Sequence, residues 1–134
     1  MKAHWKDQGP ARSQRYNDLH FLDLTGVHGA WSQPVCGGQV PSPRQDVALC
    51  AGEGKLYLHA GRDNFTREDM YALDYTDMKN LIWEVMVTGG RKPPPCYGHD
   101  LAFVDGRLFT YGGFDELGGQ ILKVYRLDLS PVGG

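Results

Sequence analysis

The chain has 134 residues, 41% of them hydrophobic and 22% charged, which is the composition of a folded domain of ordinary size rather than of a disordered segment. Its formal charge of −2 argues against a dedicated nucleic-acid binder, because phosphate binding needs a basic surplus. No apolar run approaches the roughly 20 residues needed to span a bilayer, and the three cysteines lack CxxC spacing. The sequence therefore predicts an intracellular, cytoplasmic protein with no disulfide framework, no zinc site and no other cofactor.

The predicted elements are short strands separated by turn residues, which is typical of an all-β fold. Residues 1–16 contain Gly9-Pro10 and no sustained periodicity, so they are predicted to be a flexible lead-in, and residues 130–134 a tail. Strands are expected at residues 19–24, 30–33, 47–51, 55–60, 70–75, 82–87, 101–104, 107–111 and 122–129. Asp105-Gly106 is a strong hairpin signal, because both central residues of such a turn adopt positive φ.

Several of these features recur 52 positions apart along the chain. Gly61 and Gly113 show this spacing, and so do Trp31 and Trp83. A period near 50 built from short strands is the sequence signature of a β-propeller blade, which is a twisted four-stranded antiparallel sheet.

The repeated unit resembles the kelch repeat over residues 16–129. In that family the unit opens with Pro-x-Pro-Arg-x-x-His, continues through a strand ending in Gly-Gly and a strand ending in Leu-Asp, and then carries a tryptophan. Pro41-Ser42-Pro43-Arg44 matches this opening, whereas Ala60 stands where the first glycine of the pair belongs and Cys96 where the arginine belongs. The resemblance implies structural roles for Gly61, Gly112, Gly113, Trp31, Trp83, Asp23, Asp74, Asp128 and His99.

The resemblance implies an all-β, partial kelch β-propeller of about two and a quarter four-stranded blades. Residues 17–40 would supply the third and fourth strands of an incomplete first blade. Residues 41–92 would form a complete blade, and residues 93–129 an incomplete last one. Because propellers typically close with four to eight blades, three explanations remain open. The chain is a piece of a larger propeller, it assembles with copies or partners that supply the missing blades in cis or in trans, or it is a truncated product.

Some single residues invite a chemical interpretation. His99 could be a metal ligand or a base, but its match to the kelch histidine favours a structural hydrogen bonder. His20 and His59 lie within predicted strands, with no acids or cysteines clustered at ligand spacing, so no metal site is expected. Cys50 is predicted to be a small core residue. Cys96 is either an exposed reactive thiol or a neutral turn cysteine, and the second interpretation is favoured because the only nearby cationic residues come before the three prolines.

The resemblance also points to a surface that binds partners. In kelch propellers the loops joining the second and third strands share one rim with the loops that enter each first strand, and that rim often binds proteins. Arginine and aromatic side chains are the usual anchors of interfaces. Carried over by position, this rim contains Arg44, Arg62, Asp63, Asn64, Phe65, Arg67, Tyr97, Phe114 and Asp115. For any single one of them the alternative is a merely solvated loop residue.

The sequence thus predicts a non-catalytic scaffold or adaptor that binds protein partners at this rim, with neither nucleic acid nor membrane among its partners. One alternative is a fragment of a kelch-propeller enzyme, similar to galactose-oxidase-like copper proteins or to the plant specifier proteins. Another is a truncated product with no independent function.

Overall fold

The computed structural model describes residues 14–129, which form twelve strands and no helix. Each of the nine predicted strands is present, so the all-β prediction is confirmed. They are β1 (Phe21–Asp23), β2 (Ala30–Ser32), β4 (Ala48–Gly52), β5 (Lys55–His59), β6 (Met70–Asp74), β7 (Leu81–Met86), β9 (Asp100–Val104), β10 (Arg107–Tyr111) and β12 (Val124–Asp128).

Three shorter strands were not predicted: β3 (Cys36–Gly38), β8 (Cys96–Tyr97) and β11 (Phe114–Asp115). The predicted tail and most of the predicted lead-in lie outside the described residues, although Tyr16 forms an isolated bridge with Arg44. Within residues 14–129, no helix is long and apolar enough to cross a membrane.

The middle blade is a sheet of five strands in the order β3-β7-β6-β5-β4. Strands β4 to β7 are antiparallel neighbours in chain order, as expected for a complete blade. The fifth strand, β3, runs parallel to β7, with Cys36 opposite Leu81. The sequence assigns residues 36–38 to the first blade, whereas their backbone pairs with the middle one. Only the short antiparallel pair β1–β2 is left as a separate sheet on that side.

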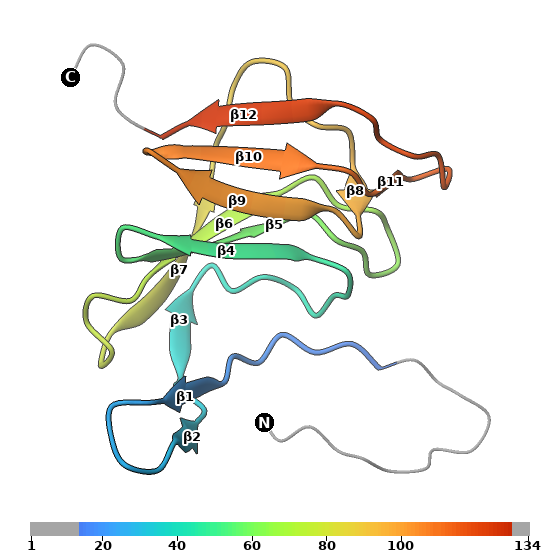
Figure 1. Ribbon diagram of the computed structural model, residues 1–134. Helices are drawn as coiled ribbons and strands as arrows, with labels where there is room; N and C mark the ends of the chain where they lie inside the picture. The colour runs from blue at the N-terminus through green and yellow to red at the C-terminus, as the bar shows by residue number, and fades with distance from the viewer. Residues whose placement is uncertain (1–13, 130–134) are drawn as a thin grey trace.

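The last blade stacks on the middle one, as Figure 1 shows. Its three strands are ordered β12-β10-β9, and a separate two-stranded sheet of β8 and β11 lies at one end. The rings of Tyr57 in β5 and Phe103 in β9 stack across the two blades, with 6.1 Å between their centroids. Because successive side chains of a strand point to opposite faces of the sheet, one face of each blade is directed at the other blade.

Two apolar clusters cover the two faces of the middle blade. The cluster between the blades contains Ala48, Tyr57, Met70, Ala72, Leu101 and Leu108, with Cys50 packed at its border as predicted. On the opposite face Leu73, Leu81 and Trp83 form the second cluster. Leu108 is completely buried, which contributes about 1.5–3 kcal/mol for a side chain of this size.

The two hairpin turns share one geometry. Asp105 and Gly106 have φ of 50° and 74°, and they join strands in which Val104 is opposite Arg107. Glu53 and Gly54, 52 positions earlier, have φ of 50° and 79°. The turn predicted from Asp-Gly is confirmed.

Gly61 and Gly113 occupy equivalent positions where the chain leaves the second strand of each blade. Their φ values are 88° and 82°. A Cβ atom would lie 2.6 Å from Cγ1 of Val47 at Gly61, and 2.7 Å from Cβ of His99 at Gly113. The repeat therefore requires glycine here for two reasons, backbone conformation and the close approach of the loop that enters the blade.

The preceding position of the repeat tolerates a side chain. Gly112 has φ of 78°, and a Cβ there would meet no atom within 4 Å. Ala60 occupies the equivalent position with φ of 60° and is fully buried. The departure from Gly-Gly in the middle blade therefore keeps the backbone conformation, at the conformational cost that a methyl group brings in this region.

The repeat tryptophans differ in environment. Trp83 is 4% exposed and packs edge-on against Tyr71, with ring centroids 6.5 Å apart. Trp31 is 71% exposed, because no neighbouring blade covers it in the described part of the chain. The predicted space-filling role therefore holds for Trp83 and not for Trp31.

The repeat aspartates organise turns. One carboxylate oxygen of Asp23 accepts hydrogen bonds from the backbone N–H and the hydroxyl of Thr25, at 2.9 and 2.6 Å. Asp74 makes the same two bonds with Thr76, at the same distances. Asp128 instead pairs at 3.2 Å with arginines of β10 and β12. The predicted acceptor role near turn amides is confirmed for the first two aspartates.

Candidate functional site

The predicted rim residues lie in three segments: the loop between β5 and β6, the short sheet of β8 and β11, and the loop that enters β4. In Figure 1 the β5–β6 loop lies at the same end of the blades as β8 and β11. Backbone bridges fix these segments, since Arg62 pairs with both Gln45 and Thr66, and Phe114 pairs with Gln120. This end of the molecule is therefore held by regular hydrogen bonds although it consists of loops.

Arg44 is buried, so it does not belong to the exposed surface. Only 9% of it is exposed, and its guanidinium binds the Asp69 carboxylate with two hydrogen bonds of 2.6 and 3.0 Å. It also donates to the backbone oxygen of Ala60 at 3.1 Å. Burial alone would raise the pKa of Asp69, but the hydrogen bonds and charge of Arg44 hold it below its ordinary value. Arg44 therefore holds the loop that enters β4 against the start of the β5–β6 loop, and its charge is not exposed at the surface.

Arg67 and Asp63 form a well-ordered ion pair at the surface. Nε and Nη2 of Arg67 donate to the Asp63 carboxylate at 3.0 and 2.8 Å, and the Ser42 hydroxyl donates at 3.1 Å. These bonds, led by those of Arg67, hold the pKa of Asp63 well below its usual range. The Arg67 guanidinium lies 5.6 Å from the ring centroid of Phe65, which is 69% exposed.

Arg62 connects the middle blade to the last one. Its Nε donates to Asp46 at 3.0 Å, and its guanidinium carbon lies 4.1 Å from the centre of the Tyr97 ring. Tyr97 in turn stacks on Phe114, with 5.7 Å between ring centroids and 30° between planes. A cation–π contact at an exposed site contributes about 0.5–1 kcal/mol, so it favours this arrangement of the side chains.

Asp115 shapes its own loop. One of its carboxylate oxygens accepts backbone N–H bonds from Leu117 at 2.9 Å and from Gly119 at 2.8 Å. Asn64 is exposed beside Phe65.

We use the term rim for the eight predicted residues that remain at the surface: Arg62, Asp63, Asn64, Phe65, Arg67, Tyr97, Phe114 and Asp115. A surface hollow of about 300 Å³ lies at one side of the rim and is lined by Asp63, Asn64, Phe65 and Arg67 together with Arg15, Ser42 and Pro43. Each of the two rim arginines has its own carboxylate partner. The rim therefore combines exposed aromatic rings with locally neutralised charge.

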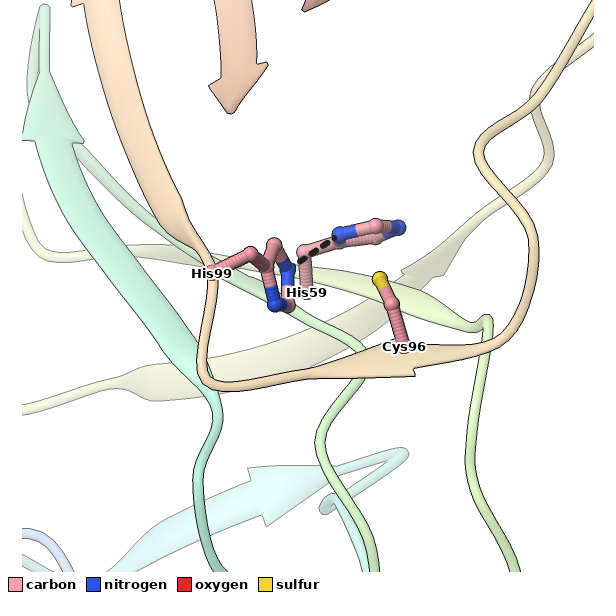
Figure 2. A group of neighbouring side chains, drawn as sticks. All are labelled: His59, Cys96 and His99. Atoms are coloured by element: carbon pink, nitrogen blue, oxygen red, sulfur yellow. Dashed lines mark hydrogen bonds between the residues drawn. The ribbon is translucent and has the colours of Figure 1, made fainter. Parts of the chain in front are cut away.

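A second group, His59, Cys96 and His99, was not predicted. The three side chains point toward one another between the two blades, with Cys96 projecting from β8 (Figure 2). Exposed fractions are 5%, 1% and 5% for His59, Cys96 and His99, and one ligand atom of each residue lies within 4.8 Å of the other two. Nδ1 of His59 and Nε2 of His99 are joined by a hydrogen bond of 2.9 Å. His99 thus makes one side-chain hydrogen bond within the group, and its structural role stays a prediction.

Burial sets the protonation of this group. It lowers the pKa of His59 to about 4, with a further contribution from the charge of His99, and it also lowers the pKa of His99. Burial raises the pKa of the Cys96 thiol to about 11. Cys96 is therefore not an exposed reactive thiol, and the favoured interpretation of a neutral cysteine fits its environment.

Cys96 and His99 are three positions apart, but His59 precedes them by 37 and 40 positions, so sequence spacing could not reveal the whole group. The order of strands in the blades is the feature that could have brought His59 close to the other two residues. The end of the second strand of one blade lies beside the loop that enters the next blade, as the backbone bond from Gly61 N–H to Cys96 C=O shows.

Comparisons with known proteins agree with this architecture. The family model described as the KLHDC2/KLHL20/DRC7 Kelch-repeats domain matches residues 8–113. The chain is 32% identical over 107 residues to host cell factor 2 of Homo sapiens, covering 73% of this chain and 13% of that protein. It is 36% identical over 114 residues to serine/threonine-protein phosphatase BSL2 of Arabidopsis thaliana, covering 82% and 11%.

A third relative is Kelch domain-containing protein 2 of Bos taurus, which is 31% identical over 112 residues, with coverage of 82% of this chain and 26% of that protein. The chain thus spans between about a tenth and a quarter of the length of these three relatives. Among solved structures, YjhT is similar with a TM-score of 0.60 and 17% identity, over 75% of this chain and 29% of that one. At that identity the likeness concerns the fold alone.

Proposed function

Because the chain belongs to the kelch-repeat family, we propose that it is a protein-recognition module whose rim binds a protein partner, as a scaffold or adaptor without a catalytic role of its own. Kelch repeats build propellers, and the position of the rim residues on loops between paired strands supports this proposal.

One observation carries the proposal: the continuous stack of Arg62, Tyr97 and Phe114 across the boundary between blades. Protein interfaces are enriched in arginine and aromatic anchors that are ordered before binding, because ordering a mobile side chain on association costs affinity. Phe65 adds a 69% exposed ring in the same loop as Arg62, and the Arg67 guanidinium lies 5.6 Å from its centroid.

The charge of the rim favours a protein over a nucleic acid as partner. Both rim arginines bind carboxylates, Arg62 with Asp46 and Arg67 with Asp63. Nucleic-acid surfaces need a local surplus of positive charge to displace counterions from phosphates. The chain as a whole carries a formal charge of −2. We place this module in the cytoplasm, on the basis of its three cysteines without disulfide spacing.

We also propose that further blades, in cis or in trans, cover the outer face of the last blade. Large apolar side chains on that face are exposed: Val104, Tyr111 and Val124 at 51%, 60% and 61%. Phe109 faces outward from the last blade, and Tyr57 is its equivalent 52 positions earlier in the middle blade. Tyr57 is buried against the next blade. The greater length of the relatives supports additional blades in a parent protein.

A second candidate function is a kelch segment within an enzyme. The chain is similar to a protein named as a phosphatase, and the match covers 11% of that protein. The remaining length of that protein leaves room for a catalytic domain beside the kelch segment, which supports this candidate. In this case the chain would serve recognition beside a catalytic domain. Phosphatase activity in the full-length parent, retained when the rim is mutated, would favour this assignment.

The rim is tested with Arg62→Ala and Arg67→Ala in the full-length protein. Cross-linking capture followed by mass spectrometry compares each variant with wild type. We expect both variants to lose a defined set of captured proteins while they remain folded, because each arginine sits at the surface.

Arg107→Ala is the matched control. The Arg107 side chain is 48% exposed and forms a 3.2 Å ion pair with Asp128, but it lies at the opposite end of the last blade, beside the Asp105–Gly106 turn. If both rim variants capture the same proteins as wild type, the rim is not the binding surface. Equal losses in Arg107→Ala would point to a general charge effect instead.

A further inference from the structure

The cluster of His59, Cys96 and His99 is built from two blades. His59 ends β5 of the middle blade, whereas Cys96 lies in β8 and His99 in the loop that enters the last blade. All three side chains are more than nine-tenths buried. Buried polar side chains are costly unless they are fully paired, so their convergence at one point between blades requires a reason.

Hydrogen bonding within the cluster is incomplete. The 2.9 Å contact between His59 Nδ1 and His99 Nε2 uses one donor and one acceptor. Nδ1 of His99 is buried and has no partner. In either tautomer of two neutral rings, that nitrogen is left as an unpaired donor or an unpaired acceptor, which costs about 1–3 kcal/mol. The histidine pair is therefore not self-sufficient.

The ligand set suits one class of metal ion. One sulfur and two imidazole nitrogens are the donors that Zn²⁺ uses in proteins, at about 2.3 Å and 2.0–2.1 Å. In a tetrahedral site these bond lengths place the ligand atoms about 3.3–3.6 Å apart. Here the ligand atoms lie within 4.8 Å of one another, so rotations that move side-chain atoms by about 1 Å close the site.

We propose that His59, Cys96 and His99 form a zinc site that ties the last blade to the middle blade. Each imidazole gives one nitrogen to the ion and keeps its single proton on the other. The Cys96 thiol loses its proton to the solvent, so one proton is released for each ion bound. A metal ion that takes Nδ1 of His99 gives a partner to the buried nitrogen that has none.

The fourth position is assigned to water. His59 also lines a cavity of about 50 Å³ between the blades, together with Glu68, Met70 and Leu108. Of the three ligands, His59 alone lines this cavity, so a water molecule there would approach the ion from the His59 side. Three protein ligands with one water is the coordination of zinc sites that keep an open position.

The test uses the 134-residue chain, first treated with a chelator and then titrated with Co²⁺ as a spectroscopic substitute for zinc. We expect one equivalent of Co²⁺ to give a thiolate-to-cobalt charge-transfer band and intense tetrahedral visible bands, and one equivalent of Zn²⁺ to abolish them. Zn²⁺ should also raise the unfolding temperature. The absence of a charge-transfer band in the wild-type chain at millimolar Co²⁺ overturns the proposal without any variant.

Variants assign the ligands. Cys96→Ser should abolish the charge-transfer band, whereas Cys50→Ser, which changes a half-buried cysteine in β4, should keep it. A band that persists in Cys96→Ser and disappears in Cys50→Ser refutes the assignment. Because Cys96 is 1% exposed and its replacement could unfold the chain, His99→Gln is the second variant. It should retain the fold and weaken Co²⁺ binding by at least about 100-fold, since loss of even an outer-shell partner of a metal ligand costs 10–100-fold. If folded His99→Gln binds Co²⁺ as tightly as the wild-type chain, His99 is not a metal ligand and the proposal is wrong.

Discussion

Replacing the two neighbouring glycines Gly112 and Gly113 separately by alanine distinguishes backbone conformation from steric contact. Both have positive φ, 78° and 82°. A Cβ at Gly112 would meet nothing within 4 Å. A Cβ at Gly113 would lie 2.7 Å from Cβ of His99, 2.7 Å from the backbone oxygen of Tyr97 and 2.9 Å from the backbone nitrogen of His99.

These contacts set the expected magnitudes. The left-handed conformation alone costs an alanine about 1 kcal/mol, and this applies to both variants. At Gly113 the atoms in the way belong to backbone and Cβ positions, so the entry loop itself must move. Overpacking of this kind adds about 1–3 kcal/mol. We therefore expect Gly112→Ala to lower the free energy of unfolding by about 1 kcal/mol and Gly113→Ala by about 2–4 kcal/mol.

Urea unfolding followed by far-UV circular dichroism measures both variants under identical conditions. The difference between the two isolates the steric term, because backbone conformation is common to both. Values for the two variants within about 0.5 kcal/mol of each other would show that the close approach at Gly113 is not the reason for the second glycine.

Three further predictions use the same assay. Asp69→Asn should destabilise the chain by about 1–3 kcal/mol at pH 7, because it breaks the bidentate pair with the buried Arg44. Since the folded-state pKa of Asp69 is lowered, the stabilisation is present above the ordinary value of 3.8 and is lost as pH falls through the folded-state pKa. The penalty should therefore shrink below about pH 4, and an equal penalty at pH 7 and pH 3 would contradict this. Trp83→Ala should lower the free energy of unfolding by about 3–5 kcal/mol, and Trp31→Ala by less than about 0.5 kcal/mol. Similar losses for the two variants would show that the Trp31 side chain is buried rather than exposed. Leu108→Ala should cost about 2–5 kcal/mol, as a fully buried leucine does, and a cost below about 1 kcal/mol would mean that the blades do not pack through it.

The fold could be predicted because its signals are local and repeated. Apolar strands and the Asp105–Gly106 turn depend on neighbouring residues, and the 52-residue spacing multiplies each signal. The strands that were missed, β3, β8 and β11, have two or three residues, which is too short for alternation to show. Strands β1 and β2 are equally short, but the apolar run at residues 19–24 and the repeat tryptophan Trp31 mark them in the sequence. The parallel pairing of β3 with β7 joins residues about 45 positions apart and depends on tertiary packing alone.

The candidate sites were predicted less well, because a short sequence motif does not show whether a side chain is buried or exposed. Arg44 matched the opening of the repeat and was placed on the rim by position, but its guanidinium points inward to Asp69. Cys96 departs from the family pattern, and His59 has no cysteines or acids clustered near it at ligand spacing in the sequence. Only the stacking of one blade on the next brings them beside His99.

The two outer edges of the structure differ in what they offer to solvent. In the middle blade, β3 occupies the free side of β7 and pairs with its outward backbone groups. Strand β12 pairs only with β10 among the described residues. Alternate amide hydrogens of β12 therefore face water directly and should exchange with deuterium rapidly, whereas those of β6, held between two strands, require the sheet to open. A record of exchange along the chain would thus show a gradient of protection that falls from the middle blade toward β12.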